Sequence, residues 1–223
     1  MKRHVIIVAG GKGLRMGSST PKQFIELRGK PIISHTIEAF TSVYPDLAVI
    51  VVIPEPHKRE WDRILSEFHT NASISTVFGG ETRFQSVYNG LKTIDDSDLV
   101  AVHDAVRPFP GEQVIRNTFD RAQKSGSAIS VVPSKDSLRK YGVEGKSIAV
   151  PRSEFALVQT PQVFQFEILK EAYKQKEISN FTDDASVVEA AGYDIHLEEG
   201  SYRNIKITTP EDLILAEHFS ARH

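Results

Sequence analysis

Short apolar runs alternate along this chain with segments whose apolar residues recur at helical spacing. The apolar, largely β-branched runs predict buried strands at residues 5–8, 47–53, 74–78, 98–102 and 128–133. Apolar recurrence every three to four residues predicts helices at residues 31–40, 55–68, 84–91 and 167–173. Because strands that alternate with helices form parallel sheets, we expect an α/β fold with a doubly wound, mostly parallel, Rossmann-like sheet. Ligands of such sheets bind at the carboxyl ends of the strands.

Residues 134–154 lose this alternation. They are rich in charged residues and glycine, with only scattered apolar positions. A two-stranded excursion of this kind is marginal in stability unless another surface packs on it. We therefore expect a protruding β-arm at residues 134–154, within a single domain of residues 1–223.

Composition narrows the classes of function. The 27 Lys and Arg residues and 29 Asp and Glu residues give a net charge of −2, which provides no overall field for nucleic acid or an anionic membrane. The absence of cysteine excludes disulfides and thiolate metal sites and suits a reducing compartment. No apolar run approaches the roughly 20 residues of a membrane span. We expect a cytoplasmic protein that binds neither nucleic acid nor membrane.

The loop after the first predicted strand has features of an anion site. Gly10, Gly11 and Gly13 let backbone N–H groups approach a phosphate closely, and Arg15 and Lys22 add positive charge. The loop lacks the Gly-Lys-Ser/Thr of a P-loop, and methionine stands where the dinucleotide fingerprint needs its third glycine. A plain glycine-rich turn with solvated cations remains the alternative.

Four later segments also carry candidate chemistry or structural signals. Asp104 follows the strand predicted at residues 98–102 and is placed to hold a ribose hydroxyl or a metal-bound water, or else to cap a turn and pair with Arg107. Its neighbour His103 suggests a hydrolase triad, but the chain has no Gly-x-Ser-x-Gly nucleophile motif. Lys206, placed in a predicted short strand between two apolar residues, needs an anionic partner or a path to solvent. Residues 182–186 read first as a helix cap, and Pro161 as a rigid turn.

Taken together, these segments resemble one enzyme family. The run from Gly10 to Met16 with Pro21-Lys22-Gln23 resembles the loop of nucleotide-sugar pyrophosphorylases and cytidylyltransferases. The segments His103-Asp104-Ala105-Val106-Arg107-Pro108, Thr160-Pro161-Gln162-Val163-Phe164 and Asn204-Ile205-Lys206-Ile207 extend the resemblance over nearly the whole chain. The family they resemble is that of the 2-C-methyl-D-erythritol 4-phosphate cytidylyltransferases, which have a nucleotide-diphospho-sugar transferase type of fold.

The resemblance implies roles for individual residues. Those it implies for catalysis are Arg15, Lys22, Arg152 and Lys206. Those it implies for CTP binding are Ala9, Gly10, Gly11, Gly13, Gly80, Glu81, Ser86 and Asp104. Those it implies for the polyol phosphate are Asp104, Arg107, Ser137, Arg152, Thr160 and Lys206. Serine stands at 137 where the family more often has threonine, so the hydroxyl is kept.

The resemblance further implies a homodimer interlocked through the 134–154 arm, and Mg²⁺ bound mainly through the CTP phosphates, with protein ligands that the sequence leaves unknown. The reaction it implies is transfer of CMP from CTP to 2-C-methyl-D-erythritol 4-phosphate, with release of pyrophosphate, in the non-mevalonate isoprenoid precursor pathway.

Two other functions stay open on the sequence. Ribitol-5-phosphate cytidylyltransferases have closely similar loops, although residues 182–186 and Arg152 with residues 157–162 look more like the erythritol enzymes. An inactive nucleotide-binding scaffold could share the fold, since a fold alone does not prove chemistry. The sugar-1-phosphate nucleotidyltransferases usually have longer sugar-binding regions than 223 residues leave room for.

Overall fold

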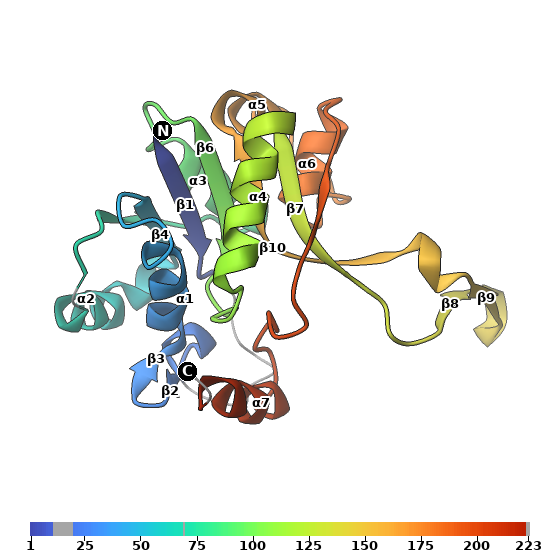
Figure 1. The fold of residues 1–223 in the computed structure, drawn as a ribbon, viewed down its shortest axis with the longest axis horizontal. Coiled ribbons are helices and arrows are strands. Elements are labelled where there is room, and N and C mark those ends of the chain that lie inside the picture. Colours follow the sequence, from blue (N-terminus) through green and yellow to red (C-terminus); the bar gives the residue numbers. More distant parts are fainter. Residues whose placement is uncertain (11–19, 69, 222–223) are drawn as a thin grey trace.

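A seven-stranded sheet forms the centre of the protein, for which the computed structural model describes residues 1–10, 20–68 and 70–221 (Figure 1). Its strand order is β11-β7-β10-β6-β1-β4-β5. The strands are β1 (Arg3–Val8), β4 (Ala48–Ile53), β5 (Ile74–Phe78), β6 (Leu99–Asp104), β7 (Ser127–Pro133), β10 (Ala156–Gln165) and β11 (Leu197–Glu199). Every pairing in this sheet is parallel except those of β10 with β6 and β7. The predicted doubly wound, mostly parallel sheet is confirmed.

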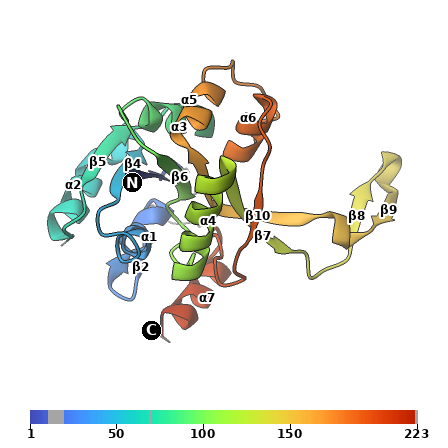
Figure 2. The same ribbon diagram turned by 45° about the horizontal axis from the view of Figure 1, so that its top comes forward.

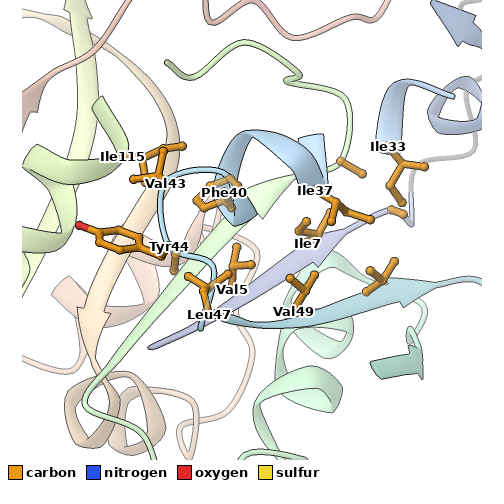
Figure 3. Packing of buried hydrophobic residues seen from close by; sticks show 14 of the residues in the cluster. Val5, Ile7, Ile33, Ile37, Phe40, Val43, Tyr44, Leu47, Val49 and Ile115 are labelled. Carbon is orange, nitrogen blue, oxygen red and sulfur yellow. The ribbon is translucent and has the colours of Figure 1, made fainter. Parts of the chain in front are cut away.

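Helices cover both faces of the sheet because the strand residues alternate between two apolar faces. The helices are α1 (Ile32–Thr41), α2 (Lys58–Glu67), α3 (Arg83–Leu91), α4 (Glu112–Ser125), α5 (Phe166–Ala172), α6 (Asp184–Ala190) and α7 (Pro210–Ser220). On one face, Val5 and Ile7 of β1 pack with α1, α2 and α4; Figure 3 shows Ile7 beside Ile37 of α1 and Val5 near Phe40 of the same helix. On the other face, Ile6 packs with α3, α5 and α6. The predicted elements did not include α4, which supplies Ile115 and Phe119 to the core.

A hairpin extends away from this body. Strands β8 (Leu138–Tyr141) and β9 (Ser147–Val150) pair antiparallel and lie far out on the long connection between β7 and β10 (Figures 1 and 2). Three of its apolar side chains are largely exposed: Tyr141 at 94%, Val143 at 84% and Ile148 at 62%. The hairpin falls within the 134–154 segment that the sequence predicts to protrude.

Two predictions of local structure are wrong. Residues 204–208 do not form a strand, because their backbone bonds elsewhere: the Ile207 N–H donates to the Val106 carbonyl at 2.9 Å without a continuing ladder. Pro161 is not in a turn but inside β10, at an irregularity where the register with β7 shifts between Val158 and Gln162.

A small second sheet joins β2 (Glu26–Leu27) and β3 (Lys30–Pro31). Within the described ranges, no helix is both long and apolar enough to cross a membrane.

Candidate active site

A cavity of about 280 Å³ opens at the carboxyl ends of β1 and β6. It lies where ligands of parallel sheets bind. Its walls come from five parts of the chain, and their residues are Val8, Ala9, Gly10, Lys22, Gln23, Gly80, Glu81, Thr82, Arg83, Ser86, Asp104, Ala105, Val106 and Lys206. Eight of the predicted site residues are among them: Ala9, Gly10, Lys22, Gly80, Glu81, Ser86, Asp104 and Lys206.

The other predicted residues are not among the described residues that line the cavity, and of these Arg107 and Thr160 contact Asp104. Gly11, Gly13 and Arg15 fall outside the described residues. Ser137 and Arg152 belong to the segment that carries the hairpin, where the Arg152 Nη1 donates to the Lys135 carbonyl at 2.5 Å. Neither of these two is among the described residues that line the cavity of their own chain.

The Asp104 carboxylate is the anion around which the cations of the site gather. Its Oδ2 accepts from Lys206 Nζ at 3.0 Å and from Arg107 Nε at 3.1 Å, while the carboxylate side chain is only 12% exposed. Burial alone would raise the pKa of Asp104, but Lys206, Arg83 and Arg107 together hold that pKa well below its ordinary value. Asp104 is therefore ionised at neutral pH. The anionic partner that Lys206 needs is this carboxylate.

Four residues close a ring of hydrogen bonds around Asp104, here called the Asp104 ring. The Asp104 N–H donates to Thr160 Oγ1 at 3.1 Å, and Asn204 Nδ2 donates to the Thr160 carbonyl at 2.7 Å. Arg107 Nη1 then donates to the Asn204 carbonyl at 2.8 Å, and Arg107 Nε returns to Asp104. Since Asn204 and Thr160 are buried, the ring fixes the segment that carries Lys206 against the end of β6 and the middle of β10.

The opposite wall is a loop in close contact with α3. The Gly80 N–H donates to Ser86 Oγ at 3.2 Å, and the Ser86 hydroxyl donates to the Thr82 carbonyl at 2.8 Å. A Cβ on Gly79 would stand 2.8 Å from Ser86 Oγ, and one on Gly80 would stand 2.4 Å from Gln85 Cβ. Glycine is thus required at both positions for the loop to lie against the helix.

Comparison with known proteins decides the family. A family model described as "IspD: 2-C-methyl-D-erythritol 4-phosphate cytidylyltransferase" matches residues 3–222. The chain belongs to this family. Among its relatives, the 2-C-methyl-D-erythritol 4-phosphate cytidylyltransferase of Bacteroides thetaiotaomicron is 50% identical over 213 residues, which cover 96% of this chain and 97% of that protein.

Solved structures of this family superimpose over nearly the whole chain. The 4-diphosphocytidyl-2C-methyl-D-erythritol synthase of Anaerococcus prevotii gives a TM-score of 0.84 at 29% identity and covers 99% of both chains. The 2-C-methyl-D-erythritol 4-phosphate cytidylyltransferase of Thermus thermophilus gives a TM-score of 0.77 at 35% identity, over 99% of this chain and 100% of that one.

Several residues that shape the site of this cytidylyltransferase were not predicted from the sequence. Gln23 is buried, and its Nε2 donates to the Ala9 carbonyl at 2.9 Å, which holds the residues after β1. Asn204 closes the Asp104 ring, and Arg83 lines the cavity. Gln23 and Asn204 stand in segments that the resemblance includes, but only their three-dimensional partners reveal what they do.

His103 supports the site from beneath rather than entering it. Its ring is fully buried, packs edge-on against Phe40 and bonds through Nε2 to the Arg107 carbonyl at 3.0 Å. Its Nδ1 has no hydrogen-bond partner among the described residues, so a proton added there would be a buried donor without an acceptor. Burial lowers the pKa of His103 to about 4 from an ordinary value of 6.5. The neutral ring that donates from Nε2 is the form that the fold stabilises.

This site predicts a pH dependence of stability. In the unfolded chain His103 gains a proton as pH falls below about 6.5, whereas in the folded chain its ring stays neutral down to about pH 4. The neutral ring therefore contributes fully to the free energy of unfolding above about pH 6.5, and this contribution is lost as pH falls from about 6.5 to about 4. Between about pH 7 and about pH 5, wild-type protein should lose about 2 kcal/mol more free energy of unfolding than His103→Gln, measured by urea denaturation. Equal losses for the two proteins would contradict this role.

Proposed function

We propose that this chain transfers CMP from CTP to 2-C-methyl-D-erythritol 4-phosphate, giving 4-diphosphocytidyl-2-C-methyl-D-erythritol and pyrophosphate. This reaction belongs to the non-mevalonate route to isoprenoid precursors. The observation that carries the proposal is a cavity at the sheet's carboxyl edge that holds Lys22, Arg83 and Lys206 around the Asp104 carboxylate. CTP and the polyol phosphate are both highly charged anions, so fixed cations must offset their repulsion before the two can approach each other. Membership of the family over residues 3–222 supports the choice of substrates.

The chemistry requires no covalent step on the protein. An oxygen of the polyol phosphate attacks the α-phosphorus of CTP, the bond from that phosphorus to the oxygen bridging the β-phosphorus breaks, and pyrophosphate leaves. The attacking phosphate is already anionic, so no general base is needed. Catalysis then consists of positioning and of stabilising charge along the line of attack.

CTP would lie along the loop after β1 and the loop before α3. Gly10, with Gly11 and Gly13 of the undescribed stretch, would offer backbone N–H groups to the phosphates, while Ala9, whose own N–H donates to the Val52 carbonyl at 2.8 Å, would line the cavity beside them. Lys22 lines the cavity, and Arg15 would add a second cation. The backbone of Gly80 and Glu81, together with the Ser86 hydroxyl, would read the cytosine, with Asp104 beside the ribose.

The polyol phosphate would lie against the Asp104 ring. Lys206, with its side chain 42% exposed, would act as a point charge for the phosphate, and Arg107 would keep Asp104 and the ring in place. Thr160 already bonds the Asp104 N–H, so its hydroxyl proton stays available to an acceptor. Ser137 and Arg152 would reach the substrate from the second subunit.

The homodimer would form through the hairpin. Tyr141, Val143 and Ile148 expose apolar surface on an excursion that has little packing of its own. Burial against a second copy would stabilise the hairpin. It would also bring Arg152 of the partner subunit to a cavity that the arm of the same chain does not line within the described residues.

A divalent metal fits this site as a companion of the triphosphate. Among the described residues, no three His, Asp or Glu side chains lie together as a metal cluster. The cavity does contain the carboxylates of Glu81 and Asp104, either of which could add a protein oxygen to an ion held by phosphates. We propose Mg²⁺, which when bound neutralises charge on the phosphates during the transfer.

Pyrophosphate release tests the function and the choice of polyol together. Purified protein is supplied with CTP and Mg²⁺ and with either 2-C-methyl-D-erythritol 4-phosphate or ribitol 5-phosphate. We expect release with the methylerythritol substrate and little with ribitol phosphate. Preference for ribitol phosphate would move the chain to the rival polyol, and release with neither substrate would favour the inactive scaffold.

Lys22 offers a test of the charge-stabilising role. Lys22→Ala should lower turnover about a hundredfold or more, because a fixed donor near the reacting phosphates is removed. The melting temperature should stay close to that of the wild type. Lys58→Ala, which removes an exposed cation paired with Asp62 on α2, serves as the control and should keep full turnover. Near-normal turnover of Lys22→Ala would contradict the role.

Mixed dimers test whether each cavity is completed by the second subunit. Arg152→Ala and Lys206→Ala should each be strongly impaired as homodimers. Co-expression of the two with different tags should restore activity, because the cavity of the Arg152→Ala chain keeps its own Lys206 and receives Arg152 of the partner subunit. The isolated mixed dimer should therefore turn over far faster than either parent. A mixed dimer no more active than its parents would place both residues in the same chain's site.

A further inference from the structure

Arg83 lines the cavity but belongs to none of the motifs that point to the substrates. It is the first residue of α3, directly after the N-cap Thr82, whose hydroxyl oxygen accepts from the Gln85 N–H. Its side chain is 29% exposed, which leaves part of the guanidinium facing the cavity. The proposed function counts Arg83 among the cations of the cavity, but it does not explain what the fixed planar orientation of its several donors adds to that charge.

The guanidinium is fixed by a buried carboxylate from a remote part of the chain. Arg83 Nη2 donates to Asp184 Oδ2 at 2.5 Å, and the Tyr173 hydroxyl donates to Asp184 Oδ1 at 2.6 Å. Asp184 is fully buried, so its charge depends on these two partners. Burial alone would lower the pKa of Arg83, but Asp184 more than offsets this and holds the pKa above its ordinary value. We refer to Arg83, Asp184 and Tyr173 as the Arg83 clamp.

Asp184 has a firm position of its own. Its neighbour Asp183 caps α6 by accepting from the Ser186 N–H at 2.9 Å. Gln162 of β10 bonds this turn twice: its Nε2 donates to Asp183 Oδ2 at 2.8 Å, and its Oε1 accepts from the Ala185 N–H at 2.9 Å. The start of α6 is therefore anchored to the sheet, and Arg83 is anchored to α6.

The fixed end of α3 in turn positions the loop that forms the cavity wall. The Gly80 N–H donates to Ser86 Oγ and the Glu81 N–H donates to Gln85 Oε1 at 2.9 Å, so the backbone of both residues takes its orientation from the first turn of α3. A shift of that turn would displace this backbone from a bound base. On the other side of the cavity, the hydrogen bonds of the Asp104 ring run among its own four members rather than to the clamp.

We propose that Arg83 is a positioning residue for the nucleotide. Through its ion pair with Asp184, Arg83 holds the cavity wall formed by Gly80 and Glu81 in the position that binds CTP. The inference rests on the proposed function for the identity of the nucleotide. Its effect falls mainly on CTP rather than on the polyol phosphate, because the ion pair with Asp184 fixes the start of α3 and the loop before it, whereas Arg83 acts on Asp104 through its charge. Lysine would not replace Arg83, since a point charge lacks the planar fork that fixes orientation.

Asp184→Asn tests the inference, because it keeps the shape of the side chain and removes the charge that orients Arg83. The dissociation constant of CTP with Mg²⁺, measured by calorimetry without the second substrate, should rise about tenfold or more. The KM for 2-C-methyl-D-erythritol 4-phosphate should stay within about threefold of the wild-type value. Arg83→Lys should show the same split between the two substrates.

Two further variants separate positioning from loss of stability. Phe119→Leu weakens the core on the other face of the sheet, so it should lower the melting temperature and leave the affinity for CTP unchanged. Tyr173→Phe removes only the bond to Asp184 Oδ1 and should weaken CTP binding to a smaller extent than Asp184→Asn. It keeps the test valid if Asp184→Asn does not fold.

The outcomes distinguish this inference from the proposed function. Unchanged CTP affinity in the folded clamp variants, or an equal loss for both substrates, would overturn the inference. Weakened CTP binding in the clamp variants would support it even if the wild-type protein released no pyrophosphate, in which case only the proposed function would fail.

Discussion

The site depends on one buried carboxylate that must remain charged. Asp104 is the last residue of the central strand β6, and burying its charged carboxylate there would be costly without partners. Its partners are Arg107, three residues further along the chain, and Lys206, which comes from the C-terminal part of the chain. Satisfying this one charge draws the C-terminal segment onto the sheet, and it places Lys206 in the wall of the cavity.

The antiparallel strand β10 makes this arrangement possible. It lies between β6 and β7 and brings Thr160 next to the Asp104 N–H, while its far end reaches the hairpin. Gln162, two residues after Thr160, anchors the start of α6 and through it Arg83. One strand thus links the proposed polyol side of the cavity, the nucleotide side and the arm. A purely parallel sheet would leave these three parts without a common support.

The sequence predicts what depends on local pattern. Hydrophobic periodicity predicted the strands near β1, β4, β5, β6 and β7, because buried parallel strands are continuous apolar runs. It also predicted the carboxyl-edge position of Asp104, and the resemblance predicted most residues that line the cavity. The strand predicted around Lys206 was wrong because an extended, alternating segment has the pattern of a strand even when its backbone hydrogen bonds go to nearby turns, a side chain and the Val106 carbonyl instead of a neighbouring strand.

Residues whose roles depend on distant partners could not be predicted. Asp183 and Asp184 look alike in the sequence, yet the first caps a helix and the second is a buried counterion for an arginine 101 positions away. Asn204 is an ordinary polar residue until Thr160 and Arg107 are placed around it. In each case a buried polar group had to find a partner, and only the packing of the whole chain decides which partner is within reach.

The most direct test of this account is the kcat/KM of Asp104→Asn with CTP and 2-C-methyl-D-erythritol 4-phosphate. The substitution keeps the volume of the side chain and removes the charge that places Lys206 and Arg107. We expect kcat/KM to fall about a hundredfold, since misplacement of a positioning group by about 1 Å can have an effect of that size. A kcat/KM within about threefold of the wild-type value corresponds to a loss of at most about 0.7 kcal/mol of transition-state stabilisation. That result would show that the cations keep their places without the charge of Asp104, and it would contradict the account.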